Sequence, residues 1–364
     1  MTATGITGGR PTLAAVAKAA GVSVSTASLA FSARGPVSTA TRDTVLAAAV
    51  SLGYPGPDPR ARSLRRGRSG VVGVVVENSV LTAFRDPVNI GMVDGVAEVL
   101  GDAGAGVLLL TDAPHARAAF DNAAMDGVVL TGCSPVVGEL LESLRRRHIP
   151  TVLVGGGGRR GIVAVDVDNL AASTALADHL HQLGHRDVAV VALPFDAPAT
   201  QWVTPALLAG SAAGTAVDRL RGVRVRYPRA PAVAATASTI HEGERLGLTL
   251  LDSDAAEAGR GRQSAAHRRP TAIIAQSDLL AVGVIRAAES LGLAVPDDLS
   301  VVGFDGIELP ALGEHTLTTM RQPMQDKGRA AATAVLRLID GGRPRSTEFS
   351  CEFVPGTTTA AAPG

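Results

Sequence analysis

The sequence contains few cysteines, few aromatic side chains and no long apolar run. Only 2 Cys, 1 Trp, 2 Tyr and 7 Phe occur in 364 residues. The two cysteines, Cys133 and Cys351, cannot build a disulfide framework, and no Cys/His spacing resembles a zinc site. The densest apolar strand, Val71–Val76, is far shorter than the roughly 18 residues of a spanning helix. The N-terminal residues include no apolar signal segment. These absences predict a soluble cytoplasmic protein with no metal, no cofactor and no membrane partner.

The composition and the charge distribution are more informative. A chain with 46% hydrophobic and 19% charged residues can bury a core, and its length predicts two or three domains. Residues 1–70 carry nine basic and two acidic side chains, a net charge of +7, so the remainder of this neutral chain carries −7. This asymmetry predicts a polyanion-binding module attached to domains of another kind.

The first 57 residues have the pattern of a helix-turn-helix. Thr12 can cap a helix with inward Leu13, Val16 and Ala17, and Ala20-Gly21-Val22 suits a tight turn. Ser23 can cap a second helix, Val24–Phe31, which buries Ala27, Ala30 and Phe31. Ser38 can cap a third helix that reaches about Leu52, with four inward residues: Val45, Leu46, Ala49 and Leu52. A plain three-helix bundle is the alternative, but the positive charge favours DNA binding.

A stiff segment, PGPDP at 55–59, separates this unit from a short basic helix at 59–66. From Val71 onward, strand-like runs alternate with helical stretches, which is typical of parallel sheets with helices on both faces. The strands are expected at 71–76, 106–110, 127–130, 151–154, 187–193, 232–236, 271–275, 299–304 and 347–354. The helices are expected at 87–103, 114–123, 136–147, 170–183, 204–221, 241–252, 279–292 and 325–340. So many strands predict two α/β lobes.

The resulting domain boundaries are a disordered N-terminus at 1–10, a helix-turn-helix domain at 11–57 and a hinge helix with linker at 58–70. A two-lobed domain for effector binding and dimerisation follows at 71–355, and a disordered tail at 356–364. Residues 253–269 interrupt the alternation and are expected to form a mobile surface loop.

The chain resembles the lactose-repressor (LacI/GalR) family of bacterial transcription regulators over about residues 11–355. The resemblance lies in TLAAVAKAAGVSVSTASLAFSARGPVSTATRDTVLAAAVSLGY, in ARSLRRGRSGVVGVVV, and in later segments that include LGHRDVAVV, PTAIIAQSDLLAVGVIRAAESLGLAVPDDLSVVGFD and LTTMRQPMQDKGRAAA. It implies a two-lobed effector domain that shares its fold with periplasmic sugar-binding proteins.

The resemblance also assigns residues that contact DNA. Val24, Ser25 and Leu29 face base edges in the major groove, and Thr26 and Ser28 hold phosphates. Leu29 stands where many members carry an arginine. Leu64 is the hinge wedge that enters the minor groove. The complete expected set is Thr12, Val24, Ser25, Thr26, Ser28, Leu29, Tyr54, Arg62, Leu64 and Arg65.

The effector site is expected at the carboxyl ends of strands. Asp278 follows one strand, and Arg219 matches the arginine that reaches the ligand in many members. The last three candidates, Asp86, Val88 and Asn89, occupy an Asn-Pro-aromatic-aromatic position of the family. The aromatic residues are absent, so a small polyol is favoured over a flat purine. The structural alternatives are a helix cap at Asp278 and a surface ion pair at Arg219.

An enzymatic function has no support, because the sequence contains no P-loop, no dinucleotide-binding glycine motif and no G-x-S-x-G. The sequence therefore predicts a homodimeric repressor of double-stranded operator DNA, controlled by a small sugar-like effector. Two alternatives stay open: a repressor whose effector domain binds no ligand, and a cytoplasmic solute-binding protein.

Overall fold

The computed structural model divides the chain into two compact units, Met1–Gly70 and Val71–Gly364. It describes residues 11–31, 37–57, 67–77, 80–131, 136–196, 200–251, 269–308 and 312–364. Three predictions fall outside these ranges: the disordered N-terminus, the hinge helix at 59–66 and nearly all of the loop at 253–269.

The first unit contains three helices, α1 (Leu13–Ala19), α2 (Val24–Ala30) and α3 (Thr39–Ser51). Each begins at a predicted cap, because the hydroxyls of Thr12, Ser23 and Ser38 accept hydrogen bonds from backbone N–H groups of the first turn. The axes of α1 and α2 bend by 99°, and Gly21 adopts a φ of +65° in the turn between them. This angle is that of a helix-turn-helix.

The core of the first unit consists of small side chains: Val16, Ala17, Ala27, Ala30, Val45 and Ala49. Three predicted positions differ from the sequence analysis. Phe31 follows the end of α2 and is half-buried, whereas Leu46 and Leu52 are each 40% exposed. Phe31 still packs against this core from its edge.

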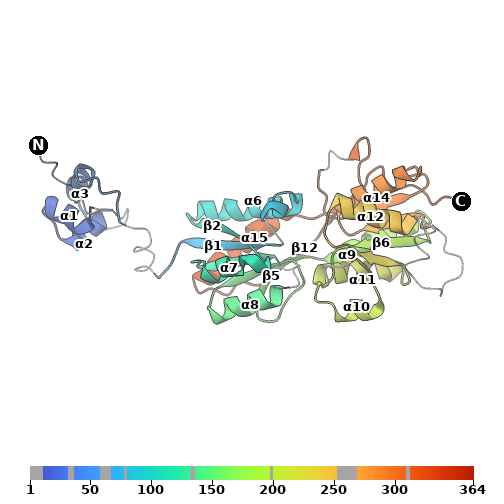
Figure 1. The fold of residues 1–364 in the computed structure, drawn as a ribbon, viewed down its shortest axis with the longest axis horizontal. Coiled ribbons are helices and arrows are strands. Elements are labelled where there is room, and N and C mark those ends of the chain that lie inside the picture. The colour runs from blue at the N-terminus through green and yellow to red at the C-terminus, as the bar shows by residue number, and fades with distance from the viewer. Residues whose placement is uncertain are drawn as a thin grey trace, which may run out of the picture. The chain divides into compact units, whose positions relative to one another are not determined.

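The first lobe of the second unit is built on a six-stranded sheet in the order β12-β5-β4-β3-β1-β2. Figure 1 labels its strands β1, β2, β5 and β12. Every pairing in this sheet is parallel. The strands are β1 (Val71–Val76), β2 (Gly106–Thr111), β3 (Gly127–Thr131), β4 (Thr151–Val154), β5 (Val163–Val167) and β12 (Thr347–Phe349). The helices are α5 (Val80–Ala83), α6 (Pro87–Asp102), α7 (Arg117–Asn122), α8 (Val137–Arg146) and α15 (Met324–Ile339), with a 3-10 turn η1 at Pro114–Ala116.

The second lobe is built on a five-stranded sheet in the order β10-β9-β6-β8-β7, which is parallel except at β7. Its strands are β6 (Val188–Ala192), β7 (Gln201–Trp202), β8 (Ala232–Ala234), β9 (Ala272–Ala275) and β10 (Ser300–Val302). Its helices are α9 (Asn169–Gln182), α10 (Pro205–Gly210), α11 (Gly214–Arg226), α12 (Ile240–Leu251) and α14 (Asp278–Ser290). Separate cores lie on the two faces of each sheet, so helices cover both faces as predicted.

Several elements differ from the sequence analysis. The short elements α5, β7 and β11 (Thr319–Arg321) were not predicted. Strand β5 was not predicted either, because Asp166 interrupts its apolar residues. The single strand expected at 347–354 is two strands, since β12 joins the first lobe and β13 (Glu352–Val354) pairs with β11. The helix expected at 204–221 is broken between α10 and α11 at Ser211–Ala213.

The chain passes between the lobes three times, at the segments β5 to α9, β11 to α15 and β12 to β13. These segments place residues from distant parts of the sequence beside one another. For example, the N–H of Asp168 donates to the carbonyl of Phe349 at 3.0 Å. We call these three segments the crossovers.

Helices α6 and α15 pack closely on the first lobe, and glycines permit the contact. A Cβ atom on Gly95 would lie 2.1 Å from the carbonyl oxygen of Gln325, and one on Gly328 would lie 2.1 Å from that of Met92. Because both obstacles are backbone atoms, only glycine allows this approach. The packing fixes the start of α15 relative to the start of α6.

The C-terminal residues 356–364 were expected to be a disordered tail, and the structure contradicts this. Thr358 is fully buried, and its hydroxyl donates to the carbonyl of Val301 at 2.7 Å. The buried ring of His185 bonds the carbonyl of Ala360, and the N–H of Ala362 donates to the carbonyl of Leu183. A run of small residues carries little sequence signal, but its backbone is bound to the second lobe.

No single helix among the described residues is long and apolar enough to cross a membrane. The bent pair α1 and α2 meets that test only when the two are taken together.

Candidate DNA-binding surface and buried polar cluster

Helix α2 is shaped by the hydroxyl groups at its start. The Oγ of Ser23 accepts a hydrogen bond from the N–H of Thr26 at 3.0 Å, and it also contacts the hydroxyls of Ser25 and Thr26 at 2.8 and 2.7 Å. This arrangement satisfies a backbone donor of the first turn and gathers three hydroxyls at the N-terminus. A helix N-terminus with hydroxyl donors is well suited to a phosphate group.

The outward face of α2 contains the side chains predicted to meet DNA. Val24 is 51% exposed and Leu29 is 39% exposed, and Ser25 is exposed as well. Thr26 and Ser28 are half-buried beside them, while Ala27 and Ala30 face the core. The face therefore offers apolar groups and hydroxyls at a surface that a base edge could reach.

Thr12 and Tyr54 hold the unit together as well as lying near its surface. Thr12 is exposed and its hydroxyl caps α1. The Tyr54 ring packs edge-on against Phe31, with ring centroids 5.6 Å apart, and is half-buried. The remaining predicted DNA contacts, Arg62, Leu64 and Arg65, lie outside the described residues.

In the second unit, Asp278 is fully buried where strand β9 ends. Its carboxylate accepts hydrogen bonds from the Thr319 hydroxyl at 2.6 Å and from the N–H groups of Gly306 and Ile307 at 2.7 and 2.9 Å. The preceding Ser277 caps α14, so Asp278 is not the cap that the alternative interpretation required. Burial raises the pKa of Asp278, and these donors oppose the rise.

Arg219 is also buried, in the middle of α11. Its Nε donates to Asn169 Oδ1 at 2.9 Å, and its Nη1 donates to the carbonyl of Gln276 and lies 3.5 Å from Asp305 Oδ1. The guanidinium carbon lies 3.5 Å from the centroid of the Phe304 ring. A surface ion pair, the alternative interpretation for Arg219, is therefore wrong.

Asp305 lies at the centre of this group. Burial raises the pKa of Asp305 to about 7, and the charges of Asp278 and Asp86 raise it too, while Arg219 lowers it. Its backbone φ is +129°, a strained value for a residue with a side chain. We call Asp86, Arg219, Asp278, Asp305 and Gln322 the polar cluster.

The segment at Asp86 forms the start of helix α6. One oxygen of Asp86 accepts from the N–H of Val88 at 2.9 Å, and the other accepts from the Asn89 side chain at 3.1 Å. Burial raises the pKa of Asp86. Of these three predicted residues, only Asp86 belongs to the polar cluster, because its charge acts on Asp305. Val88 and Asn89 bond to Asp86 itself.

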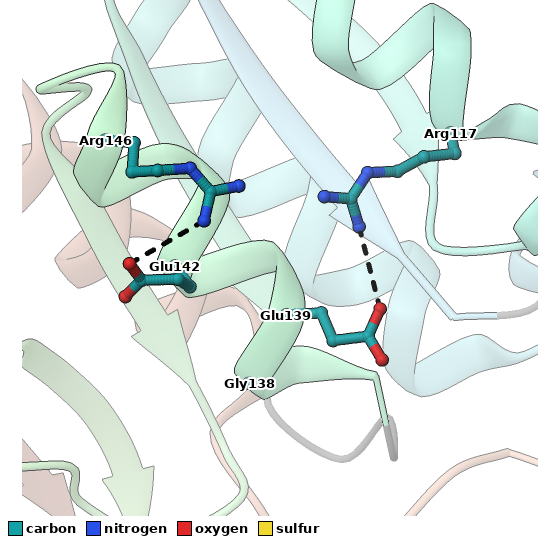
Figure 2. A pocket seen from close by; sticks show the side chains of 5 residues that line it. All are labelled: Arg117, Gly138, Glu139, Glu142 and Arg146. Carbon is teal, nitrogen blue, oxygen red and sulfur yellow. Dashed lines mark ion pairs between the residues drawn. The ribbon is translucent and has the colours of Figure 1, made fainter.

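A surface pocket lies elsewhere, between α7 and α8 of the first lobe. Figure 2 shows Arg117 directed at Glu139 and Arg146 directed at Glu142, with N–O distances of 4.0 and 3.7 Å. These charges pair with one another at the surface, and none belongs to the polar cluster. Within the described ranges, no group of three or more His, Cys, Asp or Glu residues could hold a metal ion.

Comparisons with known proteins agree with this architecture. Residues 12–56 match the lacI family of bacterial regulatory proteins, and residues 177–359 match a periplasmic binding protein-like domain. An HTH-type transcriptional regulator of Mycolicibacterium smegmatis is 30% identical over 366 residues, with 96% of both chains covered. The chain belongs to the lacI family of bacterial regulatory proteins.

Two solved structures are similar over nearly the whole chain. A complex of the transcriptional regulator CelR with cellobiose is 26% identical with a TM-score of 0.64, covering 96% of this chain and all of the other. A lac repressor dimer bound to operator and an anti-inducer is 22% identical with a TM-score of 0.75, covering 97% and 100%. At that identity, the second comparison shows the fold alone.

Membership in the lacI family confirms the recognition made from the sequence. This lacI-family chain is a DNA-binding transcriptional regulator with a helix-turn-helix domain and a periplasmic-binding-protein-like domain of two sheets. Its homologues are transcriptional regulators and not enzymes. The interpretation as a solute-binding protein is therefore wrong.

Sequence reasoning missed several members of the buried group in this lacI-family chain. Gln322 and Lys327 had no motif of their own, and Gln276 was read only as part of a strand end. Asn169 and Asp305 were not among the expected site residues. One signal could have found Gln322: it directly follows β11, in the second crossover, where distant polar residues meet.

Proposed function

We propose that this lacI-family regulator is a homodimeric repressor whose affinity for operator DNA is controlled by a sugar or related metabolite bound between its lobes. The ligand favours one relative orientation of the lobes, and that orientation governs the DNA-binding units. Because bacterial operators lie in the cytoplasm, the protein acts there. The observation that carries the proposal is the pairing of an exposed α2 face, in a unit of charge +7, with a buried polar cluster at strand ends.

The DNA-binding part rests on the exposed, capped helix α2 and on the hinge predicted from the sequence. In this proposal Val24, Ser25 and Leu29 contact bases, and Thr26 and Ser28 contact phosphates. Thr12 and Tyr54 lie at the edge of the same interface. Leu64 enters the minor groove between Arg62 and Arg65, which approach phosphates.

The hinge can be tested on two DNA duplexes. An operator is first selected from a random duplex pool, and binding to it and to a random duplex is titrated with salt. Leu64→Ala should weaken operator binding and leave random binding nearly unchanged, since phosphate contacts set the latter. Arg65→Ala should weaken both and reduce the salt slope by about one unit. Equal losses on both duplexes for Leu64→Ala would show that it is no wedge.

The proposed dimer uses an apolar face of the first lobe. The edge strand β2 exposes Val107, and α5 and α6, which both contact β2, carry Leu81 and Ile90, with Phe84 between them. Leu81 is 63% exposed and Phe84 is 58% exposed. The occupant of this face in the proposal is the same face of a second copy, because a two-fold dimer presents identical surfaces to one another.

Sedimentation of the full chain tests the dimer. Phe84→Glu should produce monomers, whereas Val225→Glu, at another exposed apolar position on α11, should leave the dimer intact. A dimer that persists in Phe84→Glu and in Leu81→Glu would show that another surface associates.

The ligand site is proposed at the polar cluster, with Asp86, Val88, Asn89, Arg219 and Asp278 as its contacts. One observation favours the second candidate, a repressor whose effector domain binds no ligand: Arg219 and Asp278 already bond within the chain. Thermal-shift screening of the full protein against neutral mono- and disaccharides and nucleosides separates the two. Stabilisation by one sugar that Asn89→Ala reduces supports a ligand site. A flat response across the panel supports the second candidate.

A further inference from the structure

Lys327 is a buried lysine on the inner side of helix α15. It is one of only two lysines in a chain with 34 basic Lys and Arg residues, and it is 8% exposed. Its Nζ donates to the side-chain oxygen of Gln322 at 2.7 Å. A lysine rarely lies this deep without a specific partner, so this contact calls for a functional explanation.

The contact determines which way the Gln322 amide faces. An ammonium group has donors only, so the oxygen of the Gln322 amide must face Lys327. The amide nitrogen then faces the other way, and it donates to Asp305 Oδ1 at 2.7 Å. Lys327 therefore presents a hydrogen-bond donor to Asp305 without touching it.

Asp305 receives this donor in a crowded electrostatic environment. Arg219 from α11 attracts its charge, whereas Asp278 at the start of α14 and Asp86 at the start of α6 repel it. Cys351, in the third crossover, also senses the charges of Arg219, Lys327 and Asp305. Burial raises the pKa of its thiol to about 11. The strained backbone of Asp305 is held by hydrogen bonds to Met320 and Gln322.

We propose that Lys327 is a positioning residue: by orienting the Gln322 amide toward Asp305, it favours the ionised form of Asp305, which pairs with Arg219, and so ties α15 of the first lobe to α11 of the second. The chain Lys327–Gln322–Asp305–Arg219 continues through Asn169 to Asp166, at 2.9 and 3.2 Å. It thereby joins two of the three crossovers. The link to regulation rests on the proposed function, since only there does lobe orientation govern operator binding.

The proposal predicts a sign for the pH dependence of stability. The pKa of Asp305 is about 7 in the folded chain and 3.8 is the ordinary value, so the folded state binds the extra proton. Protonated Asp305 therefore stabilises the fold fully below pH 4, and this contribution is lost as Asp305 ionises through pH 7, a loss that Arg219 and Gln322 limit by favouring the charged form. Removing the donor that Lys327 orients should move this loss to higher pH.

Urea unfolding of the full chain between pH 4 and 9 tests this. The Asp305 contribution is the difference in unfolding free energy between each protein and the same protein with Asp305→Asn. In Lys327→Met, the pH at the midpoint of that difference should rise by about one unit. Loss of a hydrogen bond to a charged carboxylate raises its pKa by about that amount. Lys327→Arg keeps a donor-only cation and should restore the midpoint. Arg337→Met, an exposed substitution on the same helix, should leave it unchanged.

A second variant keeps the test decisive. If Lys327→Met does not fold, Gln322→Leu should show the same upward movement. A loss of stability that is equal at every pH, or a midpoint like that of the unchanged protein, overturns the proposal. The measurement uses neither DNA nor effector, so failure of the proposed function would leave its outcome unaffected.

Discussion

In the first unit, the side chains expected to touch DNA project from α2 into solvent, with Val24 51% exposed. In the second unit, Arg219 and Asp278 are buried and bonded to three or more groups of the chain. DNA is a large ligand that must be met at a surface, whereas a small molecule is held by groups withdrawn from water. The consequence is that function and stability are separable in the first unit and coupled in the second.

The sharpest test of this difference is Asp278→Ala. The substitution leaves the Thr319 hydroxyl and two backbone N–H groups without their acceptor, so the free energy of unfolding should fall by about 3 kcal/mol or more. Urea unfolding measures it, with the exposed Asp297→Ala as the control. An unchanged stability would mean that Asp278 serves a ligand alone, and the comparison between the units would fail.

A second test uses pH on a half-buried ion pair of the second unit. The Arg245 guanidinium and the N–H of Thr236 lower the pKa of Glu242 to about 2, so its stabilisation is present above its ordinary pKa of 4.5 and is lost as pH falls through 2. Glu242→Gln should reduce the free energy of unfolding by about 2 kcal/mol at pH 7. The deficit should shrink between pH 5 and pH 2 in acid titrations followed by circular dichroism. Glu244→Gln on the same helix is the control, and a deficit independent of pH contradicts the assignment.

In the first unit, Ser23→Ala tests how far the surface helix depends on its cap. Loss of the cap should cost about 1 kcal/mol of local stability, seen as faster amide hydrogen exchange in α2 of the full chain. Ser25→Ala keeps the cap and should leave exchange unchanged while weakening DNA binding. Equal exchange in all three proteins would assign the Ser23 hydroxyl to DNA and not to the helix.

The smallest expected effect on stability is that of Leu29→Arg. An exposed residue on α2 can change without disturbing the core, so unfolding should shift by less than about 0.5 kcal/mol. Affinity for a random duplex should rise, and the salt slope should steepen by about one unit. Val225→Arg adds the same charge to the second unit and should change neither. An unaltered salt slope for Leu29→Arg would place the α2 face away from the phosphates.

Local patterns predicted most of the elements but only some of the site. Thr12, Ser23 and Ser38 marked three helix starts correctly, because a cap is read from a few neighbouring residues. Strand β5 was missed because Asp166 breaks its apolar run, and Asp166 is there to accept hydrogen bonds from Gly157 and Asn169. The C-terminal residues were misjudged because their burial depends on a distant surface that includes His185.

The sequence by itself determined the two-unit organisation, the basic character of the first unit and the helix-turn-helix, since charge, caps and apolar spacing are local properties. It also singled out Arg219 and Asp278. Only the tertiary structure decided that these two meet Asp305, that Gln322 and Lys327 complete the group, and that all of them are buried. The physical reason is that the packing of each lobe and the crossovers between them bring together residues far apart in the sequence, such as Arg219 and Asp305, which are 86 positions apart. No local pattern encodes which distant charges will share one environment withdrawn from water.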